Sequence, residues 1–326
     1  QGPGQALSLG KSWEASGFVD GGDVGLIVAA MGFAWAVFIG VPLVWLGRKL
    51  GWASDPGRAP EAVTQQAAAR PSKVPGKGGL ELLTTQAAWI GLVYLATYGV
   101  LLGLDALLVD KPGVRPMIWG FHFIIGTFLA LGLRRVADRV RPDHMLDDRT
   151  LGRISGSTVD VITCGALAAV SLTVFRANLV PILVLTTVGG TATLLACLWL
   201  ARRAFPSAPF EHAVVMFGAA TGTLPTGLAL LRILDPDMEG PVPANVVLGS
   251  AGALVLSIPL LLVVLPIPIA GFAEDYYGSI LLAVGICVVY LTLLLVGWRL
   301  VGPLRFQRPL FRIWPRPEGE ADTPPG

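Results

Sequence analysis

The chain has 326 residues, of which 53% are hydrophobic and only 14% are charged, whereas ordinary soluble domains carry about 25% charged residues. Its mean hydropathy is +0.67, and its formal net charge of +2 gives no argument for a nucleic-acid partner. These values exclude an ordinary soluble domain. They predict an all-α polytopic membrane protein, because a chain that crosses lipid must pair its backbone groups internally.

Apolar runs long enough to cross a bilayer recur along the chain. They predict about seven full spans, at residues 24–46, 82–104, 117–133, 157–175, 179–200, 244–265 and 277–300. Basic pairs follow alternate runs, at positions 48–49, 134–135 and 202–203. Lys and Arg are enriched at the cytoplasmic ends of spans. We therefore expect a multi-pass protein of the cytoplasmic membrane, with the first span running inward and the C-terminus in the cytoplasm.

The stretch 218–227, GAATGTLPTG, interrupts the apolar run 213–231. Broken backbone is tolerated at membrane depth only where it is buried in protein or lines a wet cavity. If this run crossed the membrane, the basic residues at and after the end of the last span, at positions 299, 305, 308 and 312, would lie outside. If it enters and leaves on the cytoplasmic side, every Arg-rich end lies inside. We therefore predict a re-entrant hairpin over 211–231.

The start of the chain resembles this hairpin. The two stretches share a Gly/Pro tip followed by a short apolar limb that ends in a basic residue. They are residues 2–11, GPGQALSLGK, and residues 223–232, TLPTGLALLR. The long spans that follow, 24–46 and 244–265, run in opposite directions according to their basic ends. Inverted repeats with discontinuous helices are a common plan of secondary transporters. We therefore predict an inverted-repeat transporter fold with two re-entrant hairpins.

Four segments follow from this plan. Residues 1–50 form the end of a first repeat, 51–80 a cytoplasmic linker, 81–271 the second repeat with its hairpin at 211–231, and 272–326 an extra span with a basic, Pro-rich cytoplasmic tail. The chain begins at Gln1 without an initiator Met. We expect the fold to be N-terminally incomplete, with most of the first repeat upstream, so that these 326 residues alone should not transport.

The sequence is similar to the sodium/glutamate symporter family over about residues 1–271. The resembling motifs are GPGQA at 2–6, GSTVD at 156–160, FEHA at 210–213, Gly218, TGT at 221–223, PTG at 225–227 and LLRILDP at 230–236. The resemblance implies two five-span repeats, each with a Gly-rich re-entrant loop. It also implies sodium-coupled uptake of an acidic amino acid.

The two hairpin tips are the leading candidate binding site. Limbs that end at the bilayer midplane present amide N–H groups suited to a carboxylate, while carbonyl and hydroxyl oxygens suit sodium. The candidate substrate- and ion-binding residues are Gly2, Gly4, Gln5, Asp160, Thr221, Gly222, Thr223, Pro225, Thr226, Arg232 and Asn245. We expect sodium near Thr221, Thr223 and Thr226. The alternative is that these small residues only permit close helix packing.

Three candidates also have a structural interpretation. Asp160 is either a functional intramembrane carboxylate or an interfacial group paired near Arg153. Arg232 either binds a substrate carboxylate or anchors the cytoplasmic end of its limb. Asn245 either lines the cavity or caps the sixth span.

The sequence contains no nucleophile elbow, no HExxH motif and no phosphate loop, so we predict a carrier and not an enzyme. The predicted activity is sodium-coupled symport of glutamate or a related anionic amino acid by alternating access, with no cofactor besides the coupling ion. A homodimer through the scaffold spans between 82 and 133 is a candidate assembly. The alternatives are a proton- or sodium-coupled carrier of another organic anion, and a non-transporting membrane protein that retains the fold.

Overall fold

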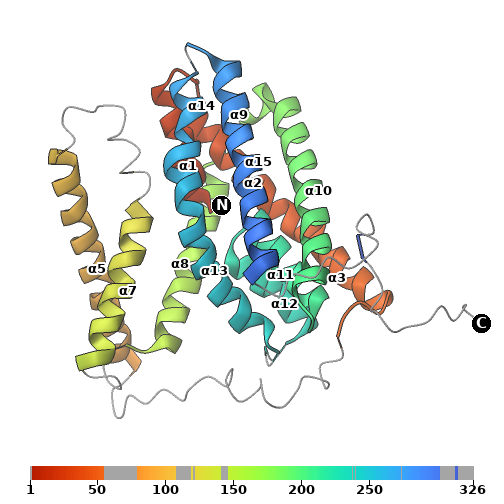
Figure 1. Cartoon of the computed structure of the whole chain (residues 1–326). Helices are drawn as coiled ribbons and strands as arrows, with labels where there is room; N and C mark the ends of the chain where they lie inside the picture. The colour runs from red at the N-terminus through yellow and green to blue at the C-terminus, as the bar shows by residue number, and fades with distance from the viewer. Residues whose placement is uncertain are drawn as a thin grey trace, which may run out of the picture. The chain divides into compact units, whose positions relative to one another are not determined.

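The computed structural model describes residues 2–54, 79–107, 119, 122–140, 146–236, 238, 240–272, 274–301 and 313–314. Helices make up most of these residues, and no strand occurs among them (Figure 1). The predicted all-α class is therefore confirmed. The predicted linker at 51–80 falls mainly on positions 55–78, which lie outside the described residues.

The chain divides into two compact units. The hairpin unit comprises residues 28–68 and 176–326, and the second unit comprises residues 2–27 and 69–175. The helices of the second unit are α1 (Pro3–Ala15), the start of α2 (Gly21–Phe38), α5 (Gly79–Leu107), α7 (His122–Val140), α8 (Asp148–Ala168) and most of α9 (Leu172–Ala177). The hairpin unit holds the rest of α2, α3 (Gly40–Lys49), α10 (Leu179–Ala204), α11 (Pro209–Thr221), α12 (Leu224–Leu234), α13 (Val242–Pro259), the π-helix η2 (Leu260–Val264), α14 (Pro266–Ala270) and α15 (Tyr276–Val301).

Among the described residues, five helical segments are long and apolar enough to cross a membrane. They are Gly21–Lys49, Glu81–Leu107, Leu179–Ala204, Val242–Ala270 and Tyr276–Leu300. Apolar side chains such as Leu281 and Leu293 stay more than half exposed on the last of them, as is typical of helices that face lipid and not water. The coarse prediction of a multi-pass membrane protein agrees with these helices.

The third and fourth predicted spans are not among the five helical segments that are long and apolar enough to cross a membrane. The helix α7 carries Arg134, Arg135 and Arg139 within its last two turns, and α8 carries Arg153 and Asp160. These charges shorten the apolar part of each helix, because a charged side chain in the middle of a bilayer is expensive. Part of the third predicted span also falls on 117, 118, 120 and 121, outside the described residues. Membrane crossing by α7 and α8 stays a prediction.

Two predicted spans are broken by proline. The first consists of α2 and α3, separated at Ile39, and Pro42 lies in the first turn of α3. The sixth consists of α13, η2 and α14, with Pro259 before the π-helical turn and Pro266 after it. Proline lacks an N–H and removes one bond from the helical ladder, so a break or a widened turn at these positions is expected.

The core of the hairpin unit surrounds α11. Its side chains Phe210, His212, Val214 and Phe217 have no exposed surface, and α10, α12, α3 and α13 contact it (Figure 1). The long spanning helices are far more exposed than this short helix. The hairpin unit therefore buries the short helix α11 and leaves its long apolar helices largely exposed.

Candidate functional site

The predicted hairpin is a helix–turn–helix whose two limbs, α11 and α12, are joined by Gly222 and Thr223 alone. At 13 residues α11 is the longer limb, which gives it a length of about 20 Å against about 30 Å for a bilayer core. Neither limb can cross alone. Most of 218–227 is helical, so the irregular tip is shorter than the sequence indicates. The entry of the hairpin into a membrane stays a prediction.

Glycine holds the two limbs at backbone contact. A Cβ atom on Gly218 would lie 2.7 Å from the Cα atom of Gly227, and a Cβ on Gly227 would overlap the carbonyl oxygen of Val215. No side chain fits between these limbs. At these two positions the small residues therefore do permit close helix packing. This packing role does not exclude a binding role for the tip.

Three threonines surround the break between the limbs. The N–H of Thr223 donates to the hydroxyl of Thr226 at 3.4 Å, and the two hydroxyl oxygens are 3.0 Å apart. The hydroxyl of Thr221 donates to the carbonyl of Phe217 at 2.8 Å. The structure therefore brings the oxygens of Thr223 and Thr226 together, while the hydrogen of the Thr221 hydroxyl is engaged within α11.

Opposite helix ends meet at this break. The carbonyl groups of the last turn of α11 and the N–H groups of the first turn of α12 flank Gly222. Unpaired carbonyls at a C-terminus carry partial negative charge, and unpaired N–H groups at an N-terminus carry partial positive charge. The tip thus offers oxygen atoms to a cation and the positive end of a helix dipole to an anion within a few residues of each other. The described residues hold no group of three or more His, Cys, Asp or Glu side chains that could bind a metal.

The helix α2 approaches the tip at backbone distance. A Cβ on Gly32 would overlap the carbonyl oxygen of Thr221, and a Cβ on Gly190 of α10 would lie 2.5 Å from the ring of Trp35. Gly32 thus permits α2 to approach the Thr221 carbonyl at the tip, and Gly190 permits α10 to approach α2.

The helix α3 holds the base of the hairpin. Arg48 donates to the carbonyl of Ile233 in the last turn of α12. The carboxylate of Glu211, at the start of α11, accepts the amide N–H of Ser54 at 2.6 Å and its hydroxyl at 3.3 Å. Both limbs are therefore attached to the end of α3 and the residues that follow it.

A buried histidine links the hairpin to α13. The Nδ1 atom of His212 lies 2.8 Å from the carbonyl of Ala208, and its Nε2 atom lies 3.2 Å from Nδ2 of Asn245. Because a carbonyl only accepts, Nδ1 carries the proton and Nε2 accepts from the amide. The ring of Phe205 stacks on the imidazole at 3.8 Å.

The structure corrects one interpretation of Asn245. Pro241 is the N-cap of α13, and Asn245 lies inside the helix, so it does not cap the sixth span. Its side chain binds His212 instead. Sequence reasoning assigned no role to His212 or Glu211. The sequence did carry a signal for both residues, because a carboxylate and an imidazole in an apolar limb need hydrogen-bond partners; unpaired polar groups are costly there.

The remaining predicted site residues lie elsewhere. Arg232 is exposed in the last turn of α12, about 12 Å along the helix axis from the tip, which favours its interpretation as an anchor. Asp160 is exposed on α8 of the second unit. Gly2, Gly4 and Gln5 belong to the same unit, at the start of α1. Pro225 is in the first turn of α12, where its missing N–H leaves no helical bond unmade.

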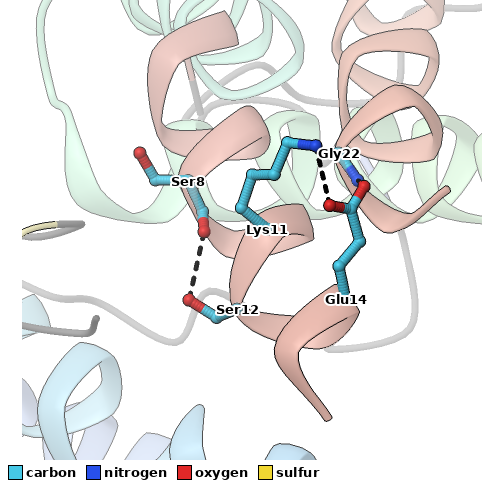
Figure 2. Close-up of polar contacts among 5 residues, drawn as sticks. All are labelled: Ser8, Lys11, Ser12, Glu14 and Gly22. Carbon is cyan, nitrogen blue, oxygen red and sulfur yellow. Dashed lines mark hydrogen bonds and ion pairs between the residues drawn. The ribbon is translucent and has the colours of Figure 1, made fainter. Parts of the chain in front are cut away.

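A polar network closes the turn between α1 and α2 (Figure 2). Lys11 donates to Glu14 at 2.7 Å, and the other oxygen of Glu14 accepts the N–H of Gly22 at 2.9 Å. The hydrogen bond from Lys11 lowers the pKa of the Glu14 carboxyl below its usual value, and the Gly22 N–H lowers it further. This network fixes the direction in which the chain leaves the short helix.

The order of elements around α1 matches that around α12. Each short helix follows an extended residue, Gly2 or Thr223, has proline in its first turn and leads through a turn into a long apolar helix. This order of elements is compatible with the predicted repeat, which stays a prediction. The inverted orientation of the two copies stays a prediction.

Comparison of the chain with protein-family models, with curated proteins and with solved structures gives no match. The resemblance to sodium/glutamate symporters therefore rests on the residues quoted above.

Proposed function

We propose that this protein is a secondary transporter that carries glutamate or a related anionic amino acid together with sodium. The observation that carries the proposal is the break at Gly222 and Thr223 in a helical hairpin whose limbs pack against α10, α3 and α13. A break of this kind leaves backbone groups to be satisfied by something other than the helix. Ions and substrates satisfy such groups in transporters with discontinuous helices.

The chemistry of the tip fits a hard cation. The adjacent hydroxyl oxygens of Thr223 and Thr226 and the last carbonyls of α11 are neutral oxygen donors. Hard cations prefer such oxygen ligands. Because the described part of the chain gathers no carboxylate cluster here, a monovalent ion such as sodium fits better than a divalent one.

The same tip supports binding of an anion. The N-terminus of α12 presents the positive end of the helix dipole, although Pro225 has no N–H and the N–H of Thr226 is bonded to the Thr223 side chain. A substrate carboxylate placed there would lie close to the bound cation, and each would favour the binding of the other. This mutual dependence is the physical basis that we propose for coupled transport.

Uptake into proteoliposomes tests the proposal. The full-length protein should accumulate radiolabelled glutamate when an inward sodium gradient is applied. A Cβ on Gly222 would lie 3.0 Å from the Thr226 hydroxyl, so Gly222→Leu should abolish uptake while the protein still inserts. Gly249→Leu is the matched control, because no atom lies within 4 Å of a Cβ at Gly249.

Three outcomes are informative. Uptake that needs a pH gradient and no sodium would replace sodium by a proton in this proposal. Sodium-dependent uptake of another organic anion, without glutamate uptake, would change the substrate class. No uptake of any acidic amino acid or dicarboxylate under either gradient would refute transport and favour a non-transporting protein with this fold.

A further inference from the structure

An aromatic cluster covers the base of the hairpin. Trp314, which follows the last helix α15, stacks on Trp52 with ring centroids 5.0 Å apart and planes 24° apart. It meets Phe210 edge-on at 6.1 Å, and Trp52 meets Phe210 at 6.0 Å. The guanidinium of Arg202 lies 5.5 Å from the Trp314 ring. All four residues belong to the hairpin unit.

Each partner of Trp314 belongs to a different element of the hairpin base. Phe210 lies in the first turn of α11 and is fully buried. Trp52 follows α3, and its backbone N–H donates to the carbonyl of Gly47 at 2.8 Å. Arg202 lies in the last turn of α10. One side chain from the end of the chain therefore bridges three elements that are distant from it in sequence.

The start of α11 has a strained backbone conformation. No side chain caps this helix, and Ala208, its N-cap residue, has a φ of 47°. A left-handed conformation is unfavourable for a residue with a Cβ atom and persists where surrounding contacts impose it. The contacts around this residue include the His212–Ala208 hydrogen bond, the Glu211–Ser54 hydrogen bonds and the aromatic cluster.

We propose that Trp314 is a latch on the base of the hairpin. While Trp314 is seated, α11 is held against the ends of α3 and α10. When it leaves, the Trp52–Phe210 contact loses its cover and the Ser54–Glu211 hydrogen bonds open more often. Any event that displaces Trp314 would thereby loosen the hairpin. This regulation goes beyond the proposed transport function and does not depend on the substrate.

Hydrogen–deuterium exchange of the full-length protein in lipid nanodiscs tests the latch. In Trp314→Ala, the amides of 52–54 and 208–213 should exchange at least fivefold faster than in the parent protein. Trp314→Phe keeps an aromatic ring and should stay within twofold of the parent. Ile313→Ala is the matched control, because Ile313 is an exposed neighbour in the same segment and should leave the rates unchanged.

Unchanged exchange in Trp314→Ala, or equal acceleration in Ile313→Ala, would overturn the latch. Should Trp314→Ala not fold, Trp314→Leu is the second variant, because leucine keeps apolar volume but removes the ring stacking. Exchange in Trp314→Leu should be at least twofold faster than in the parent protein. No acceleration in this variant would overturn the latch. The readout needs no transport, so its failure leaves the transport proposal intact, and failed transport leaves the latch intact.

Discussion

Glu211 and Ser54 are 157 positions apart in the sequence, yet one carboxylate accepts both the amide N–H and the hydroxyl of the serine. Glu211 is only 6% exposed. A buried carboxylate is costly unless it is hydrogen-bonded, so this pair is a specific attachment of the hairpin to the residues after α3. It makes the base of the hairpin a defined structure.

Replacing Glu211 should destabilise the protein. Glu211→Ala removes both hydrogen bonds and leaves the Ser54 N–H without its acceptor, which should lower the free energy of unfolding by about 1–3 kcal/mol. Ser54→Ala removes only the 3.3 Å hydroxyl bond and should cost less than about 1 kcal/mol. Unfolding in mixed micelles measures both values. Equal losses in the two variants would show that the short amide bond is not the main contact.

The glycine contact between the limbs should not tolerate a methyl group. In Gly227→Ala the new Cβ overlaps the Val215 carbonyl, and we expect a loss of about 1–3 kcal/mol in the free energy of unfolding. Gly249→Ala has open space around the new atom and should stabilise α13 by about 0.5–1 kcal/mol. The same micelle titration distinguishes them, and a neutral Gly227→Ala would contradict the limb packing.

Ala208→Gly should stabilise the protein. Glycine removes the left-handed strain of about 1–2 kcal/mol and loses part of that gain to its larger backbone entropy, so a net gain of about 0.5–1 kcal/mol is expected. Ala169→Gly is the control: Ala169 has a φ of −82°, so glycine brings no relief there and should not stabilise. A thermal midpoint that falls in Ala208→Gly would contradict the strained start of α11.

Asn245→Ala should uncouple α13 from the hairpin. The substitution leaves the buried Nε2 atom of His212 without its donor, which should cost about 1–3 kcal/mol of unfolding free energy. Ser250→Ala on the same helix removes an exposed hydroxyl bonded to Val246 and should change stability by less than about 0.5 kcal/mol. If the two variants behaved alike, the His212–Asn245 hydrogen bond would contribute nothing measurable.

The sequence predicted the features that depend on local composition. Glycine and proline within 218–227 located the hairpin because both residue types are unfavourable in the interior of a helix. The length of the apolar runs located the five long helical segments, because an apolar run that is long enough to cross a bilayer is visible in the sequence itself. The extent of the irregular tip was overestimated, because Thr223 and Thr226 hydrogen-bond to each other and allow α12 to begin directly after the turn.

The contacts that hold the hairpin base could not be predicted from the sequence. Glu211 binds Ser54, and Phe210 meets Trp52 and Trp314, across separations that no local pattern encodes. His212 binds Asn245 across 33 positions. Such pairs depend on which helix faces pack together, and an apolar helix that is hydrophobic all round gives no periodic signal of its buried face.

The linkage between sodium and glutamate binding tests the central claim most directly. In equilibrium binding to the full-length protein, replacing potassium by sodium should lower the Kd for glutamate at least tenfold, because we propose that the two ligands share the tip at Thr223 and Thr226. Thr226→Val should abolish this dependence. Thr193→Val should keep it, since that hydroxyl only bonds Gly189 within α10. A Kd that is the same in both salts, or a sodium dependence that survives in Thr226→Val, would contradict the account.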